Sequence, residues 1–159
     1  MSTTTYETPS DTEIVITRVF DAPRRLVFAA WTEPEHLPHW FGRRGWTLPV
    51  CEVDLRPGGA WRFVHRGPDG SELAMSGVYR AVDPPERLVY TESYDGGRTA
   101  TVNTVHFDEQ EDRTTITCTI RYPSRESRDA VLTTGMRQGT TEGFNRLADY
   151  LRDLDKEQS

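Results

Sequence analysis

The sequence predicts an α+β fold in which a curved antiparallel sheet of about seven strands wraps around one long C-terminal helix. Short runs of alternating polar and apolar residues, separated by turns rich in Gly and Pro, fill the middle of the chain. Residues 125–154 instead carry apolar side chains at spacings of three and four, the period of an amphipathic helix. The concave face of such a sheet needs a cover, and this helix is the element long enough to provide it.

The first strand is predicted over residues 13–20, where β-branched side chains dominate. Residues 1–12 precede it, are rich in Ser and Thr, and are expected to form a disordered tail. Residues 13–156 are expected to form a single domain, because no linker-like stretch divides them and their number suits one hydrophobic core.

Two short helices are predicted after the first strand. Pro23 suits the first turn of a helix, because its fixed φ is already helical and its missing N–H is not needed there. Residues 26–31 then give this helix an apolar face. A further turn or two is expected over residues 33–37, before Pro38 interrupts the pattern.

Six strands are predicted next, in the order of an antiparallel meander. Turn sequences separate them, among them Pro-Asp-Gly at 68–70 and Asp-Gly-Gly at 95–97. The predicted strands are residues 46–55, 60–66, 72–82, 87–94, 99–107 and 114–122.

Three glycines stand four residues apart within the predicted long helix: Gly135, Gly139 and Gly143. Each glycine destabilises a helix interior by about 1 kcal/mol relative to alanine. Their presence on one face therefore suggests that side chains are not tolerated there. Either another part of the backbone packs closely against this face, or the face borders a cavity. Gly135 is also a point at which the helix could bend or break.

Composition argues against two classes of partner. The chain of 159 residues has a net charge of -6, whereas a nucleic-acid-binding surface needs clustered basic residues. No apolar run approaches the ~20 residues of a membrane span, so no membrane insertion is expected. With no signal-peptide core and two cysteines, too few for a disulfide scaffold, a cytoplasmic location is expected.

Several segments together resemble the activator of heat shock protein 90 ATPase homologue-like family of the START/Bet v 1-like (SRPBCC) superfamily. The matching segments, which span about residues 13–154, are ITRVFDAPRRLVFAAWTEPEHLPHWF, DLRPGGAWRF, PDG, PPERLVYTE and TGMRQGTTEGFNRLADYL. The resemblance implies a helix-grip fold with a cavity between the long helix and the sheet. Members of the superfamily bind lipids, sterols, plant hormones or polyketides, and some are cyclases. The eukaryotic activators carry an additional N-terminal domain, for which this chain is expected to have no room.

Side chains from the strands and from the long helix are the candidate lining of that cavity. Aromatic residues at alternating strand positions would face it from the sheet, although ordinary core packing explains most such residues equally well. The candidate ligand-binding residues are Trp61, Phe63, Met75, Tyr79, Tyr90, Tyr94, Met136, Gly139, Thr140 and Gly143.

Acid–base chemistry would need His65 and Glu92 in one apolar pocket, where burial would shift their pKa values. They are the catalytic candidates, against the simpler interpretation of hydrogen-bonded or solvated side chains. His36 and His39 lie near two glutamates, but a catalytic zinc site usually takes three protein ligands. No metal and no cofactor are therefore expected.

Three functions fit these observations. The first, which the sequence favours, is a non-catalytic protein that binds a small apolar or aromatic molecule between the C-terminal helix and the sheet. The second is an adaptor that binds a chaperone or another protein through its surface. The third is an enzyme similar to a polyketide cyclase or an isomerase. A cavity lined by apolar groups and tyrosine hydroxyls would favour the first, and a cavity that also contains both His65 and Glu92 would favour the third.

Overall fold

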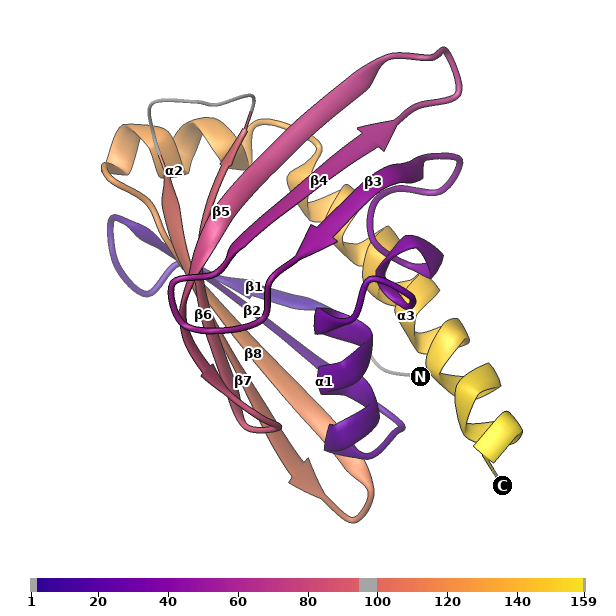
Figure 1. Cartoon of the computed structure of the whole chain (residues 1–159). Helices are drawn as coiled ribbons and strands as arrows, with labels where there is room; N and C mark the ends of the chain where they lie inside the picture. The colour runs from indigo at the N-terminus through magenta and orange to yellow at the C-terminus, as the bar shows by residue number, and fades with distance from the viewer. Residues whose placement is uncertain (1–2, 95–99, 159) are drawn as a thin grey trace.

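A computed structural model of the chain describes residues 3–94 and 100–158, with side chains described up to residue 154. One antiparallel sheet forms a layer, and helices cover its concave face (Figure 1). The strands are β1 (Thr5–Glu7), β2 (Glu13–Phe20), β3 (Thr47–Val53), β4 (Ala60–Arg66), β5 (Glu72–Asp83), β6 (Arg87–Tyr94), β7 (Thr101–Gln110) and β8 (Arg113–Arg121). The helices are α1 (Arg24–Thr32), the 3-10 helix η1 (Leu37–His39), α2 (Arg125–Leu132) and α3 (Met136–Gln158).

The predicted α+β helix-grip fold is confirmed. The sheet order is β1-β2-β8-β7-β6-β5-β4-β3, so strands β3 to β8 form the predicted meander and β2 joins it beside β8. Strands β2, β4 and β6 have the predicted bounds. At one edge, β1 has three residues. At the other edge, β3 contains Pro49 and a register irregularity between Thr47 and Val50.

The sheet has eight strands within the described residues rather than about seven, because Thr5–Glu7 form β1 inside the predicted tail. Tyr6 pairs with Ile16 in the ladder between β1 and β2. The Tyr6 hydroxyl donates a hydrogen bond to the Arg137 carbonyl (2.8 Å) and lies 2.7 Å from the Thr141 hydroxyl. Contacts with distant parts of the chain therefore hold β1, and its own sequence gives little indication of a strand. The predicted turn at 95–97 lies outside the described residues.

The predicted helix over residues 125–154 is two helices. Ser124 caps α2, since its hydroxyl accepts a hydrogen bond from the Ser127 N–H (3.0 Å). The chain then breaks at residues 133–135, the alternative that the glycine there allows, before α3 begins. The prediction that Pro38 interrupts the second short helix is wrong. Pro38 lies inside η1, near its start, where a helix needs no N–H.

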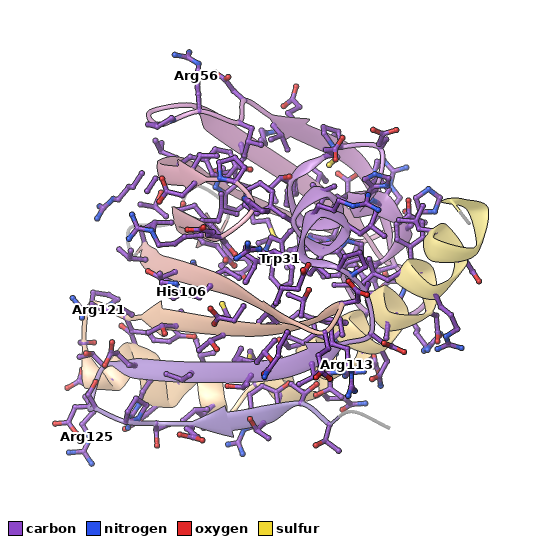
Figure 2. The ribbon with its side chains drawn as sticks, turned by 90° about the horizontal axis from the view of Figure 1, so that it is seen from below. Trp31, Arg56, His106, Arg113, Arg121 and Arg125 are labelled. Atoms are coloured by element: carbon purple, nitrogen blue, oxygen red, sulfur yellow. The ribbon has the colours of Figure 1, made fainter. Side chains whose placement is uncertain are left out.

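The core lies between the concave face of the sheet and the helices, and Trp31 of α1 is near its centre (Figure 2). The Trp31 ring centroid lies 5.1 Å from that of Trp40, 5.8 Å from that of Phe107 and 5.6 Å from that of Phe144. These rings come from the η1 region, β7 and α3, so one indole ties the helices to the sheet. Edge-to-face and tilted aromatic pairs of this kind are the favoured arrangements.

The glycine face of α3 packs against residues 37–43, which we call the η1 segment. A Cβ at Gly143 would lie 3.6 Å from the Gly42 carbonyl oxygen, and one at Gly139 would lie 2.8 Å from Nε of Arg43. The Arg43 Nη2 donates a hydrogen bond to the Gly135 carbonyl (2.7 Å). Of the two alternatives for this face, the structure therefore shows close packing, with an arginine side chain lying along the glycines.

Arg146 of α3, three residues after Gly143, also holds the η1 segment. Its guanidinium donates hydrogen bonds to the carbonyls of Gly42 (3.0 Å), Arg43 (3.2 Å) and His39 (3.2 Å). The His39 ring also stacks on Tyr150, with centroids 4.7 Å apart and planes at 8°. One side chain thus binds three carbonyls of an irregular segment, and the Arg43 carbonyl also accepts from the Trp46 N–H (3.1 Å).

The contact between Arg43 and Gly139 can be measured by a double-mutant cycle. Gly139→Ala should change the free energy of unfolding little by itself, because a helix-propensity gain of about 1 kcal/mol is offset by displacement of Arg43. In an Arg43→Ala background the same substitution should show the full gain. Urea unfolding of the four proteins gives the coupling.

Gly143→Ala is the matched control for this cycle. Its added methyl group would make an ordinary contact at 3.6 Å, so it should stabilise both backgrounds to the same extent. An equal effect of Gly139→Ala with and without Arg43 would contradict the account of the glycine face.

Candidate functional site

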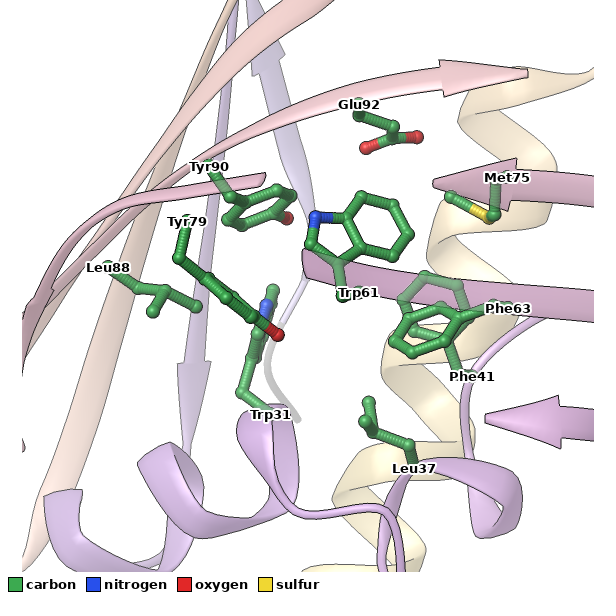
Figure 3. A pocket seen from close by; sticks show the side chains of 10 residues that line it. All are labelled: Trp31, Leu37, Phe41, Trp61, Phe63, Met75, Tyr79, Leu88, Tyr90 and Glu92. Carbon is green, nitrogen blue, oxygen red and sulfur yellow. The ribbon is translucent and has the colours of Figure 1, made fainter. Parts of the chain in front are cut away.

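A small cavity lies between strands β4 to β6 on one side and α1 with the η1 segment on the other (Figure 3). Its open space is about 20 Å³, enough for about one water molecule. The side chains that line it are Trp31, Leu37, Phe41, Trp61, Phe63, Met75, Tyr79, Leu88, Tyr90 and Glu92. Most of this lining is aromatic or aliphatic, as is usual for small-molecule sites.

Strand alternation directs the sheet residues into the cavity, and cross-strand pairing brings them together. Phe63 of β4 is opposite Met75 of β5, and Tyr79 of β5 is opposite Tyr90 of β6. Neighbours two residues apart on one strand share a face, which places Trp61 beside Phe63 with ring centroids 4.8 Å apart. Among the alternating aromatic residues of these strands, Trp61, Phe63, Tyr79 and Tyr90 therefore face the cavity, whereas Tyr94 of β6 is 49 % exposed and lies outside the lining.

Gly77 shapes the sheet side of the cavity. It is opposite Trp61 in the ladder, and the Trp61 indole N–H donates a hydrogen bond past it to the Thr91 carbonyl (3.1 Å). A Cβ at Gly77 would overlap that carbonyl and come within 2.7 Å of the indole nitrogen. The bare position therefore lets the indole lie across the strand, where it forms one wall of the cavity.

Tyr79 supplies one of the polar groups that face the cavity, beside the Tyr90 hydroxyl, which is hydrogen-bonded to Trp31. Its side chain is 4 % exposed, and its hydroxyl points into the cavity (Figure 3). Among the described residues the Tyr79 hydroxyl has no hydrogen-bond partner. Burial raises the pKa of Tyr79, so the hydroxyl keeps its proton at neutral pH and can act as a donor.

Glu92 supplies the charged polar group of the lining. Its carboxylate accepts a hydrogen bond from the Tyr94 hydroxyl (2.7 Å) and one from the Asn103 amide (3.3 Å). Burial raises the pKa of Glu92. The ion pairs formed among the described residues include none with Glu92. It is thus an acceptor in apolar surroundings whose described partners are neutral.

His65, the other catalytic candidate, is not part of the cavity lining. Its ring stacks on Phe41, with centroids 5.3 Å apart, and its Nε2 lies 3.1 Å from Sδ of Met75. Burial lowers the pKa of His65 to about 4. Phe41 and Met75 face the cavity while His65 contacts them from behind, so the structure does not bring His65 and Glu92 together as an acid–base pair.

The structure divides the predicted ligand-binding residues into two groups. Those that line the cavity are Trp61, Phe63, Met75, Tyr79 and Tyr90. Those outside the lining are Tyr94, Met136, Gly139, Thr140 and Gly143. The residues predicted on α3 lie outside the lining because α1 and the η1 segment, rather than α3, form the helical wall of the cavity.

Four lining residues were not predicted: Trp31, Leu37, Phe41 and Leu88. The apolar face of the first short helix was the available signal for Trp31. Phe41 follows Trp40, which is buried and whose indole N–H donates a hydrogen bond to the Ala30 carbonyl (2.9 Å).

Glu33, Glu35 and His36 bring potential metal-ligand atoms within 4.8 Å of one another. His39, the other histidine of this region, stacks on Tyr150 instead. The Nδ1 atom of His36 is also hydrogen-bonded to the Tyr150 hydroxyl. These histidine contacts attach residues 36–39 to α3.

None of the described helices is both long and apolar enough to cross a membrane.

Burial of His65 predicts a loss of stability in mild acid. Between about pH 6.5 and pH 4 the unfolded chain binds a proton that the folded chain excludes, so stability falls as the pH falls. The contribution is at most about 3 kcal/mol. His65→Gln should flatten the dependence of the free energy of unfolding on pH in this range, as measured by urea unfolding. His106→Gln, at an exposed position of β7, is the matched control (Figure 2).

Comparisons with known proteins agree with this architecture. A protein of Rhodobacter sphaeroides is 31% identical, with 94% of this chain and 99% of that chain covered and a TM-score of 0.88. A protein of Mycobacterium smegmatis is 26% identical, with 95% and 97% covered and a TM-score of 0.84. No functionally curated protein matches the chain. The family model described as activator of Hsp90 ATPase homolog 1-like protein matches residues 21–152, and the chain belongs to that family.

Proposed function

We propose that this protein binds a small apolar or aromatic molecule in the cavity between β4–β6 and the helical wall of α1 and the η1 segment. The observation that carries the proposal is the Tyr79 hydroxyl, which faces the cavity and has no hydrogen-bond partner among the described residues. A ligand that carries an acceptor could bind this hydroxyl, and the aromatic lining suits the body of a ligand.

Binding requires the cavity to enlarge, because about 20 Å³ holds no more than about one water molecule. The η1 segment is the wall best suited to move. It contributes Leu37 and Phe41 to the lining, and polar contacts with α3 hold it, through Arg43 and Arg146. Breaking these contacts costs no ladder hydrogen bond of the sheet, so the segment can open while the strands keep their shape.

A non-catalytic role fits this geometry better than catalysis. Glu92 faces the cavity without His65, so the acid and base that cyclisation or isomerisation would need are not paired there. An adaptor role, which the family's description suggests, would use the surface. The exposed large apolar side chains among the described residues are Leu55, Val78 and Tyr94, fewer than those that line the cavity.

A cytoplasmic location is part of this proposal. Cys51 and Cys118 are both free thiols. Unpaired cysteines are usual in the reducing cytoplasm, where disulfides are rare.

Amide NMR titration with fatty acids, sterols, flavonoids and aromatic polyketides tests the binding. We expect saturable shifts at Trp61, Tyr79 and Tyr90 with at least one class. Tyr79→Phe should weaken the binding of members that carry an acceptor by about tenfold, the value of one hydrogen bond near 1.4 kcal/mol. Binding of members without an acceptor should not change. If no class shifts these residues, the proposal is wrong.

The opening of the η1 segment should control the rate of entry. Arg146→Gln removes its three carbonyl contacts and should speed association of the neutral fluorescent probe N-phenyl-1-naphthylamine, measured by stopped flow. Arg152→Gln, on the same helix, changes an arginine whose described partner is Asp149 (2.9 Å) and is the matched control. Equal association rates for the two variants would exclude the η1 segment as the route.

A further inference from the structure

The Glu92 carboxylate lines the cavity and forms no ion pair with any cation among the described residues. Figure 3 shows its carboxylate beside the rings of Tyr90 and Trp61, on the sheet side of the cavity. The Tyr94 hydroxyl and the Asn103 amide bind it from β6 and β7. Each carboxylate oxygen has lone pairs for more than one donor, so these two neutral partners leave part of its capacity unused.

Among the residues that the structure describes, the groups that interact with Glu92 supply no positive charge. They are Tyr90 and Tyr94 on β6, Asn103 on β7, Cys118 on β8 and Tyr122 just after β8. Burial, and next to it the Glu92 charge, raises the pKa values of Tyr122 and of the Cys118 thiol; burial chiefly raises that of Tyr90, and the Glu92 charge chiefly raises that of Tyr94. These groups therefore stay neutral around Glu92. A half-buried carboxylate without a cation can still gain from binding one.

Aromatic rings surround the space in front of this carboxylate. Trp61 and Tyr90 are perpendicular, with centroids 5.8 Å apart, and Tyr79 and Tyr90 are 6.2 Å apart at 68°. Ring faces attract cations, most strongly where water is excluded. A carboxylate among ring faces therefore favours a cation on an apolar body. A neutral group gains less there, and an anion is repelled.

We propose that the cavity selects ligands that carry a protonated amine, with the amine bound to Glu92 and an apolar or aromatic body packed among the rings. The inference rests on the proposed ligand-binding function and specifies the chemical class of the ligand. Tyr79 is on the opposite strand of the β5–β6 pair, and its free hydroxyl would meet another part of the same ligand.

Three probes with one body and different polar ends test this selection: 4-phenylbutylamine, 4-phenylbutan-1-ol and 4-phenylbutanoate. Calorimetric titration near pH 7.5 should show the amine binding at least tenfold more tightly than the alcohol, because its hydrogen bond to Glu92 is charge-assisted. The carboxylate should bind more weakly than the alcohol. Equal binding of the amine and the alcohol would overturn the inference and leave the binding function intact. If none of the three binds, both the inference and the proposed function fail for this cavity.

Glu92→Gln keeps the shape of the side chain and removes its charge. It should abolish the preference for the amine, so that the amine and the alcohol bind this variant with similar affinity. Glu52→Gln is the matched control. It removes an exposed carboxylate of β3 whose ion pair with Arg62 (3.7 Å) is at the surface. An amine preference that survives Glu92→Gln would overturn the inference.

The pH dependence of the wild-type protein gives a second measurement that needs no variant. The pKa of Glu92 is raised above its ordinary 4.5 by burial, so the free carboxylate takes up a proton at a higher pH than a surface glutamate does. Affinity for the amine should therefore fall as the pH is lowered through this raised value, while affinity for the alcohol stays level. Parallel curves for the two probes would show that Glu92 does not contact the amine.

Discussion

The docking of the η1 segment on α3 is the constraint on which the rest of the site depends. One guanidinium, that of Arg146, binds three carbonyls of this irregular segment. With the backbone held in this way, Phe41 covers His65 and forms a wall of the cavity. The bare face of α3 is the other half of this arrangement, because side chains at Gly135 and Gly139 would occupy the space that the Arg43 side chain now fills.

The cavity that results combines an apolar interior with two polar groups of opposite character. The Tyr79 hydroxyl offers a proton, and the Glu92 carboxylate offers lone pairs, from neighbouring strands of the sheet. In a site with little water each of these groups discriminates strongly between ligands, because a wrong partner leaves it unsatisfied. Members of a fold family can thus share the sheet and helices and differ in ligand through a few such positions.

Much of the fold could be predicted from local patterns, while the site depended on contacts between distant residues. Alternation and turn sequences located β2, β4 and β6 correctly. β1 was missed because Tyr6 gains its partners, Arg137 and Thr141, only in the folded chain. The glycines were recognised as unusual, but nothing in the sequence indicates that Arg43, 92 positions before Gly135, would lie over them. The cavity wall was therefore assigned to the wrong helix.

The two edges of the sheet determine whether a strand of another chain can pair with it. A long, flat edge strand with free N–H and C=O groups is a template for another strand. Here one edge is the three-residue β1, and the other, β3, is interrupted by Pro49 and an irregular register. A proline lacks the N–H that a new ladder would need. Neither edge therefore favours the addition of a strand from another molecule, and association with a partner would depend on side-chain surfaces.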